Sequence, residues 1–240
     1  PAPISSTRMR VVVWGEAALL VAVVVAAAAL STTDQWQDWA LVGLLTVLVL
    51  GSDFIVLEAR RFRIGGSFLG LVLAMAVLGP APAGALGLAS AAVGAVRSKT
   101  RGPELLSNVV TYATFPLAGA LTLQSLEGSL SDSSFAVAVL FVFIAANVLN
   151  FVMIAGHTVL LRGGSLLTMF RTVYLPVLPW ELATASLTAM AVYGFEVYGE
   201  AVIGLFVVSL ATCQLLLRAV LRGQENEQEV ERRTDQLDVR

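Results

Sequence analysis

The stretch FVFIAANVLNFVMIAGHTVLLR, residues 141–162, decides the fold class. Its apolar residues run continuously up to Arg162, whereas a strand of a membrane β-barrel alternates apolar and polar residues. A helix rises about 1.5 Å per residue, so about 20 apolar residues cross the roughly 30 Å hydrocarbon core of a bilayer. We therefore expect this stretch to be a membrane-spanning helix.

The composition of the whole chain agrees with this reading. Of the 240 residues, 57% are hydrophobic and 13% are charged, and the mean hydropathy is +0.82. A soluble domain carries about 25% charged residues, so this chain has too little polar surface to cover a water-facing globule. We predict an all-α fold, a polytopic membrane helix bundle whose first partner is the lipid bilayer.

Apolar runs separated by glycine, proline and charged residues give about eight expected spans. They cover residues 11–30, 40–57, 67–79, 82–97, 106–126, 135–161, 173–194 and 199–221. The third and fourth are short and meet at GPAPAG, residues 79–84, whose prolines and glycines break a helix. They form either two short helices in a thinned bilayer or a re-entrant hairpin. Gly84, Gly87 and Gly94 are expected to allow close helix approach.

Charged residues predict the orientation of the bundle. The 15 Lys and Arg residues precede the first expected span or follow the second, fourth, sixth and eighth. The other loops carry acidic residues, namely Asp34, Asp38, Glu127, Asp132, Glu196 and Glu200. Because positively charged loops stay in the cytosol, we expect both termini to be cytosolic and the number of passes to be even.

The polar end of the chain is expected to be a separate unit. We divide the chain into a transmembrane helical bundle, residues 1–221, and a cytosolic helical connector or tail, RGQENEQEVERRTDQLDVR, residues 222–240. Acidic residues precede basic ones there at helical spacing, which favours a helix that couples the bundle to a further domain. A solvated tail is the alternative. A connector would also let two chains pair as a homodimer through this C-terminal helix.

Polar residues within the spans are the candidate site, because burying them in a membrane costs free energy. Asn147, Asn150 and His157 are spaced to share one helix face. Glu181 follows Pro176 and Pro179, which are expected to kink the seventh span. These side chains either hold the bundle together through interhelical hydrogen bonds or line a pocket for a small-molecule ligand, with Asn147, Asn150, Glu181 and His157 as ligand-binding residues.

Two further polar groups lie near the predicted cytosolic side. Glu16, in the first span, is expected to pair with an arginine there. Asn108, Thr111 and Tyr112 form a polar patch near the start of the fifth span.

The sequence offers no catalytic residue, cofactor site or metal ligand set. A single histidine and a single cysteine make a poor metal site, and no phosphate-binding glycine loop is present. No basic patch interleaved with aromatic residues indicates nucleic acid. Whether the protein is an enzyme therefore depends on what lies beyond residue 240.

Four stretches together resemble the N-terminal multi-pass membrane (sensor) region of bacterial HD-GYP-type signalling proteins. They are FRIGGSFLGLVLAMAVLGPAPAGALGLASAAVGAV (62–96), LLSNVVTYATFPLAGAL (105–121), FVFIAANVLNFVMIAGHTVLLRGGS (141–165) and YLPVLPWELATASLTAMAVYG (174–194). The resemblance covers roughly residues 40–230. It implies a location in the bacterial cytoplasmic (inner) membrane. It also implies a cytosolic output domain beyond residue 240 with cyclic-di-nucleotide phosphodiesterase activity, the hydrolysis of cyclic di-GMP by a phosphohydrolase domain.

Two functions remain open at this point. In the first, the chain is the sensor or input module of a signalling protein and passes a ligand or envelope state to the output domain by moving its last helix. In the second, it is a small-molecule transporter or the solute-binding membrane subunit of one, with Asn147, Asn150 and Glu181 at a midplane site.

Overall fold

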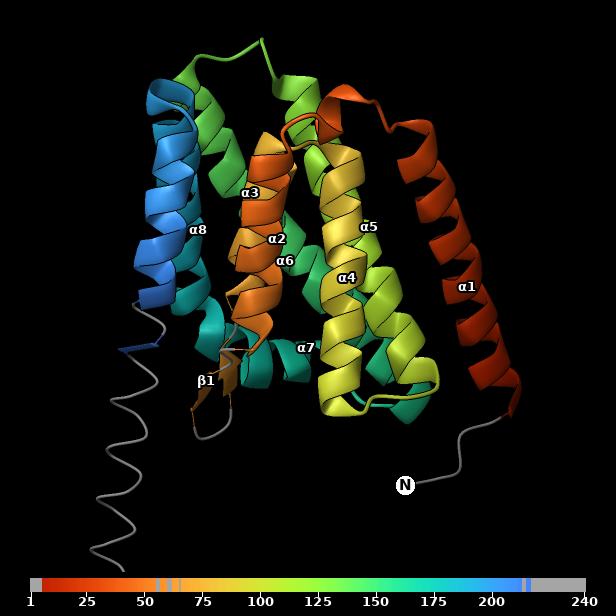
Figure 1. Ribbon diagram of the computed structural model, residues 1–240. Helices are drawn as coiled ribbons and strands as arrows, with labels where there is room; N and C mark the ends of the chain where they lie inside the picture. Colours follow the sequence, from red (N-terminus) through yellow and green to blue (C-terminus); the bar gives the residue numbers. More distant parts are fainter. Residues whose placement is uncertain (1–5, 55–56, 60–61, 65, 213–214, 217–240) are drawn as a thin grey trace, which may run out of the picture.

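The computed structural model of the chain is an all-helical bundle with one small β-hairpin (Figure 1). It describes residues 6–54, 57–59, 62–64, 66–212 and 215–216, so the predicted connector 222–240 lies outside the described residues. The helices are α1 Ser6–Ala29, α2 Trp39–Phe54, α3 Ser67–Val77, α4 Pro80–Ser98, α5 Pro103–Leu126, α6 Asp132–Arg162, α7 Leu166–Met169, α8 Leu175–Tyr198 and a last helix, Glu200–Thr212.

Three short elements complete the fold. A 3-10 helix, η1, covers Asp34–Trp36, and a π-helix, η2, covers Phe170–Tyr174. The strands β1 (Leu57–Ala59) and β2 (Phe62–Ile64) pair antiparallel directly after α2. The sequence analysis did not predict this hairpin, because it continued the second span to residue 57.

Within the described residues, four helical segments are long and apolar enough to cross a membrane. They are Thr7–Ala29, Pro103–Leu126, Asp132–Arg162 and Leu166–Tyr198, the last of which joins α7, η2 and α8. The helices Trp39–Ser52, Ser67–Val77 and Glu200–Thr212 are apolar but shorter. The chain is therefore a helical membrane protein, and four of the expected spans have the dimensions of complete crossings.

The outer surface of the bundle is apolar. Large side chains on several helices are mostly exposed, including Trp14 at 73%, Phe141 at 65%, Met190 at 70% and Leu205 at 70%. A soluble protein rarely exposes large apolar side chains on so many neighbouring elements, whereas a lipid-facing surface requires them. This surface supports a bilayer environment independently of helix length.

Charged residues gather at the two opposite ends of the bundle. At one end α1 begins, α4 ends and α5 begins, and the hairpin and α7 lie there too (Figure 1). We call it the basic end, since its described charged residues include Arg8, Arg10, Arg97, Lys99, Arg101, Arg162 and Arg171. The opposite, acidic end carries Asp34, Asp38, Glu127, Asp132, Glu196 and Glu200. Basic and acidic loops, which alternate along the sequence, thus lie at opposite ends of the bundle.

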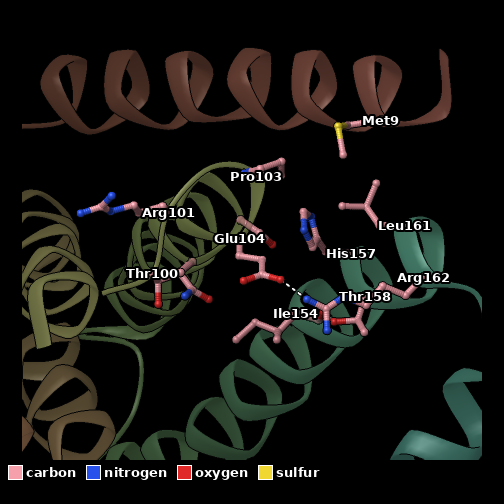
Figure 2. Close-up of a pocket in the computed structure, with 12 residues that line it drawn as sticks. Met9, Thr100, Arg101, Pro103, Glu104, Ile154, His157, Thr158, Leu161 and Arg162 are labelled. Atoms are coloured by element: carbon pink, nitrogen blue, oxygen red, sulfur yellow. Dashed lines mark hydrogen bonds and ion pairs between the residues drawn. The ribbon is translucent and has the colours of Figure 1, made fainter. Parts of the chain in front are cut away.

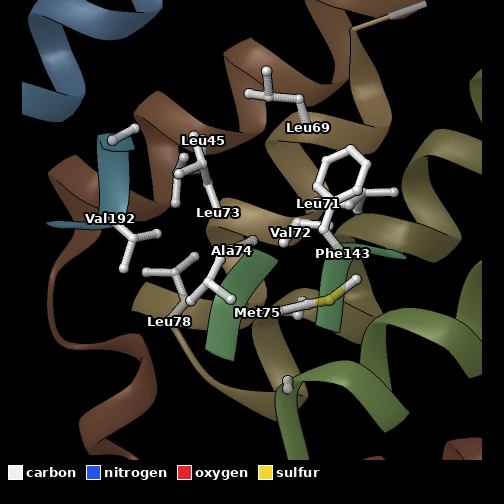
Figure 3. Packing of buried hydrophobic residues seen from close by; sticks show 14 of the residues in the cluster. Leu45, Leu69, Leu71, Val72, Leu73, Ala74, Met75, Leu78, Phe143 and Val192 are labelled. Carbon is white, nitrogen blue, oxygen red and sulfur yellow. The ribbon is translucent and has the colours of Figure 1, made fainter. Parts of the chain in front are cut away.

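The short helix α3 forms the centre of the core. It contacts α2, α4, α5, α6 and α8, and residues Leu71, Val72, Leu73 and Ala74 are fully buried (Figure 3). A helix that is apolar on all sides is expected to be surrounded by protein. Its 11 residues rise only about 16 Å, which is shorter than the hydrocarbon core of a bilayer.

The pair α3–α4 turns back on itself, which both alternatives predicted for these two segments allow. Gly79 adopts a φ of 87°, which a residue with a side chain rarely tolerates, and Pro80 then starts α4. The chain therefore leaves the basic end along α3 and returns to it along the 19 residues of α4.

One of the three glycines predicted for close helix approach has that role. A Cβ atom on Gly87 of α4 would overlap the backbone carbonyl oxygen of Tyr112 on α5. Gly84 and Gly94 have no atom within 4 Å of an added Cβ, so the prediction is wrong for both. The close contact depends on which glycine faces α5, and glycine content alone does not reveal that.

Candidate functional site

A buried hydrogen bond joins α6 to α8. Nδ2 of Asn147 donates to Oε2 of Glu181 at 2.7 Å, and Asn147 is only 7% exposed. In a low-dielectric interior each of these groups needs a partner, so the bond satisfies both at one contact. This confirms the interhelical hydrogen bond that the sequence analysis offered as one reading of the two residues.

The backbone just before Glu181 is irregular. The π-helix η2 widens the turn immediately ahead of Pro176, and Pro179 lies inside α8. Proline has no N–H to donate, and its ring clashes with the carbonyl four residues back, so a wider turn ahead of Pro176 relieves the contact. The expected disruption of this span is therefore present, and its form is a π-helical turn.

The aromatic rings of η2 pack against α6. The ring centroid of Phe151 lies 5.0 Å from that of Tyr174 and 6.0 Å from that of Phe170. The irregular turn is consequently held to α6 on one side by rings, and the helix that follows it is held to α6 by the Asn147–Glu181 bond.

His157 lies apart from this pair and belongs to a second polar contact. Its Nδ1 atom is 2.7 Å from Oε1 of Glu16 on α1, and the two side chains are 6% and 17% exposed. The expectation that Glu16 pairs with an arginine is therefore wrong, because its close partner is the histidine. Nε2 of His157 and Oε2 of Glu16 are buried and have no hydrogen-bond partner among the described residues.

The separation of His157 from Asn147 has a simple geometric cause. The two residues are ten positions apart, which places them about 15 Å apart along the axis of α6. Residues on one helix face can thus contact different neighbours at different depths. Asn150 lies between them, and its Oδ1 atom is buried and has no hydrogen-bond partner in the part of the chain that the structure describes.

A cavity of about 550 Å³ opens at the basic end, between α1, the start of α5 and the end of α6 (Figure 2). His157 lines it together with Ser107 and Asn108 of α5 and Thr158 of α6. Its other lining residues are Met9, Thr100, Arg101, Pro103, Glu104, Ile154, Leu161 and Arg162. The volume is within the range of small-molecule sites, roughly 300–1,000 Å³.

Charged groups surround the mouth of this cavity. Arg162 of α6 forms an ion pair with Glu104 of α5 (Figure 2). Both side chains are more than half exposed, at 66% and 52%, so solvent screens the pair. Arg101 is exposed at the rim and has no ion pair among the described residues.

Sequence reasoning missed most of the cavity. Of the polar patch predicted at the start of the fifth span, Asn108 lines it, whereas Thr111 is fully buried and its hydroxyl has no partner among the described residues. Arg101 and Arg162 had served only as markers of orientation, and Glu104 was not singled out. Their closeness to His157 is a tertiary property, since it depends on how the start of α5 packs against the end of α6.

Comparisons of the chain with protein-family models, with curated proteins and with solved structures found no match. Among the described residues, the fold and the polar contacts define a helical membrane protein with two interhelical polar contacts inside the bundle, a more exposed ion pair between α5 and α6, and a polar cavity at the basic end. The ligand-binding roles of Asn147, Asn150, Glu181 and His157 stay predictions.

Proposed function

We propose that the chain is the membrane-embedded sensor or input module of a bacterial signalling protein, which couples a ligand or envelope state to an output domain beyond residue 240. The observation that carries this proposal is the Asn147–Glu181 hydrogen bond, which lies about two helical turns after the π-helical turn η2 on the same continuous helical segment. Glu181 thus combines a polar contact to α6 with an irregular backbone, on the helix α8 that precedes the helix Glu200–Thr212.

The proposed mechanism is a shift between two packings of α8 against α6. A π-helical turn contains one residue more than the corresponding α-helical turn, so its loss or migration rotates the helix that follows. The Asn147–Glu181 bond favours one of the two packings, and a ligand that competes for either side chain would favour the other.

The movement has a direct route to the end of the chain. α8 passes through Gly199 into the helix Glu200–Thr212, and a Cβ added to Gly194 would lie 2.8 Å from Cγ1 of Val202. Ile203 and Val207 of the last helix belong to the same buried core as α3. A rotation of α8 would therefore be transmitted to the helix that leads toward residue 222.

The finer topology is part of the same proposal. The four long spans and the four further helical segments make eight passes, with the basic end in the cytosol and the membrane being the bacterial cytoplasmic (inner) membrane. The separation of charge between the two ends supports this orientation. Residues 222–240 would form the connector, with a homodimer formed through it and a cyclic-di-nucleotide phosphodiesterase as output, as the resemblance implies.

Two measurements test the proposal. The first is to read the native gene past the codon of Arg240. A helix that continues into an output domain is expected, and a stop codon at that position contradicts the proposal. The second compares the output activity of the full-length protein carrying Glu181→Leu with that of wild type. The control is Leu182→Ala, which changes a 44% exposed neighbour. We expect only Glu181→Leu to change the activity.

A transporter or solute-binding subunit is the second candidate. The observation that favours it is the polar cavity of about 550 Å³ at the basic end, which is large enough to hold a solute. Net uptake of a solute by proteoliposomes that contain only this chain would support transport over sensing.

A further inference from the structure

We propose that the cavity at the basic end binds a phosphate group carried by a small molecule or by a lipid headgroup. This names the ligand class of the proposed input module. The binding of phosphate is argued independently of the proposed function, and only its signalling consequence rests on that function.

Cationic side chains at the mouth of the cavity support an anion. Arg101 and Arg162 contribute two positive charges, and Glu104, paired with Arg162, contributes the one carboxylate that lines the cavity. In Figure 2 the guanidinium of Arg101 points out from the rim, where its exposed side chain can turn toward a ligand. Guanidinium groups match the oxygens of a phosphate with two parallel hydrogen bonds.

The start of α5 adds a second source of positive potential. Pro103, Glu104 and Ser107 place the first turn of α5 against the cavity, and Gly102 provides no side-chain cap for the helix. Pro103 has no N–H, and the N–H groups of Leu105 and Leu106 donate to the carbonyl oxygen of Gly102, so the contribution at this position is the dipole of the 24-residue helix, which favours a negative charge at its start.

The buried face of His157 provides an observation independent of these charges. The side chain is 6% exposed, lines the cavity and leaves Nε2 without a hydrogen-bond partner among the described residues. Because Nδ1 is already engaged by Glu16, Nε2 is the nitrogen available to a ligand. An Nε2 atom that carries its proton donates a hydrogen bond to a phosphate oxygen.

The remaining lining fits an organic phosphate better than inorganic phosphate alone. Asn108 and Thr158 offer further hydrogen-bonding groups, while Met9, Ile154 and Leu161 offer apolar contact. About 550 Å³ exceeds the space that a bare phosphate fills, so the ligand carries an additional group.

Four probes in a phosphate-free maltoside detergent test the proposal on the full chain. Glycerol 3-phosphate is compared with glycerol, and phosphatidylglycerol with diacylglycerol, by calorimetry or by thermal stabilisation. Binding of glycerol 3-phosphate identifies a soluble ligand, whereas binding of phosphatidylglycerol alone identifies a lipid headgroup. Either result supports the site, provided that the phosphate-free counterpart does not bind.

Matched arginine variants locate the site. Arg101→Gln should weaken binding of the phosphate probe about tenfold, as expected for loss of a charge-assisted hydrogen bond. Arg171→Gln, at the same end but outside the cavity lining, should leave binding unchanged. Equal weakening by both variants, or no preference for a phosphate-bearing probe, would overturn the inference. The sensor proposal would survive that result, because it depends on Asn147 and Glu181.

Discussion

Nδ1 of His157 and Oε1 of Glu16 lie 2.7 Å apart, so a buried polar pair ties the first helix of the chain to the sixth. The membrane-crossing part of α1 buries none of its residues fully, whereas that of α5 is half buried. The pair therefore attaches α1, a helix with little buried surface, to α6 at one specific position. His157 of this pair also lines the cavity at the basic end.

Breaking this anchor should destabilise the bundle. Glu16→Ala leaves Nδ1 of His157 buried without a partner, which should lower the free energy of unfolding by about 1–3 kcal/mol. Unfolding in a denaturing detergent measures the loss. In a double-mutant cycle with His157→Ala, the second replacement should cost much less once the first is present. Additive losses would show that the two side chains do not interact.

The contact between α4 and α5 predicts opposite effects for two glycines of one helix. Gly87→Ala places a Cβ atom on the carbonyl oxygen of Tyr112, so the helices must separate, at a cost of about 1–3 kcal/mol. Gly94→Ala meets no atom within 4 Å and should be neutral or stabilise by up to about 1 kcal/mol through helix propensity. Thermal unfolding of the two variants in the same detergent compares them. Equal effects would contradict the close approach at Gly87.

The link between α6 and α8 should depend on an acceptor at position 181 and not on its charge. Glu181→Gln keeps a carbonyl oxygen for Nδ2 of Asn147 and should unfold close to wild type. Glu181→Leu leaves the amide of Asn147 unpaired and should lose about 0.6–2 kcal/mol. The difference between the two variants in unfolding free energy is the measurement. A Gln variant as unstable as the Leu variant would mean that the charge itself is required.

Cysteine labelling in intact cells tests the orientation. In a Cys213→Ser background, Ser129→Cys lies at the acidic end and Ser98→Cys at the basic end, and both positions are exposed. A membrane-impermeant thiol reagent should label position 129 in intact cells and position 98 only after the membrane is opened. The reverse pattern would invert the proposed topology.

Helix positions were largely predictable because continuous apolar runs end at glycine, proline or charge. The expected span 106–126 corresponds to α5, Pro103–Leu126, and the span 135–161 to α6, Asp132–Arg162. The first turns of both helices were missed, since polar residues at a membrane surface extend a helix beyond its apolar part. The hairpin β1–β2 and the π-helix η2 were not predicted, because neither has a periodicity long enough to recognise in so few residues.

The candidate site was predictable in its residue types and not in its pairing. Because polar side chains are costly within apolar runs, the sequence correctly identified residues that need partners, namely Asn147, Glu181, His157 and Glu16. The sequence placed Asn147 and His157 on one face of a helix, but a shared face does not fix the neighbours. Which helix stands opposite each residue is set by packing between segments as distant as Glu16 and His157, which are 141 positions apart.

The enclosure of α3 constrains the order in which the protein can be assembled. Eleven residues are too few to hold a position across a bilayer alone, and in the finished bundle this helix contacts five others. Some of those partners, α5, α6 and α8, are synthesised after it. The centre of the molecule is thus completed late during biosynthesis, when α5, α6 and α8 close around a segment that entered the membrane before they were made.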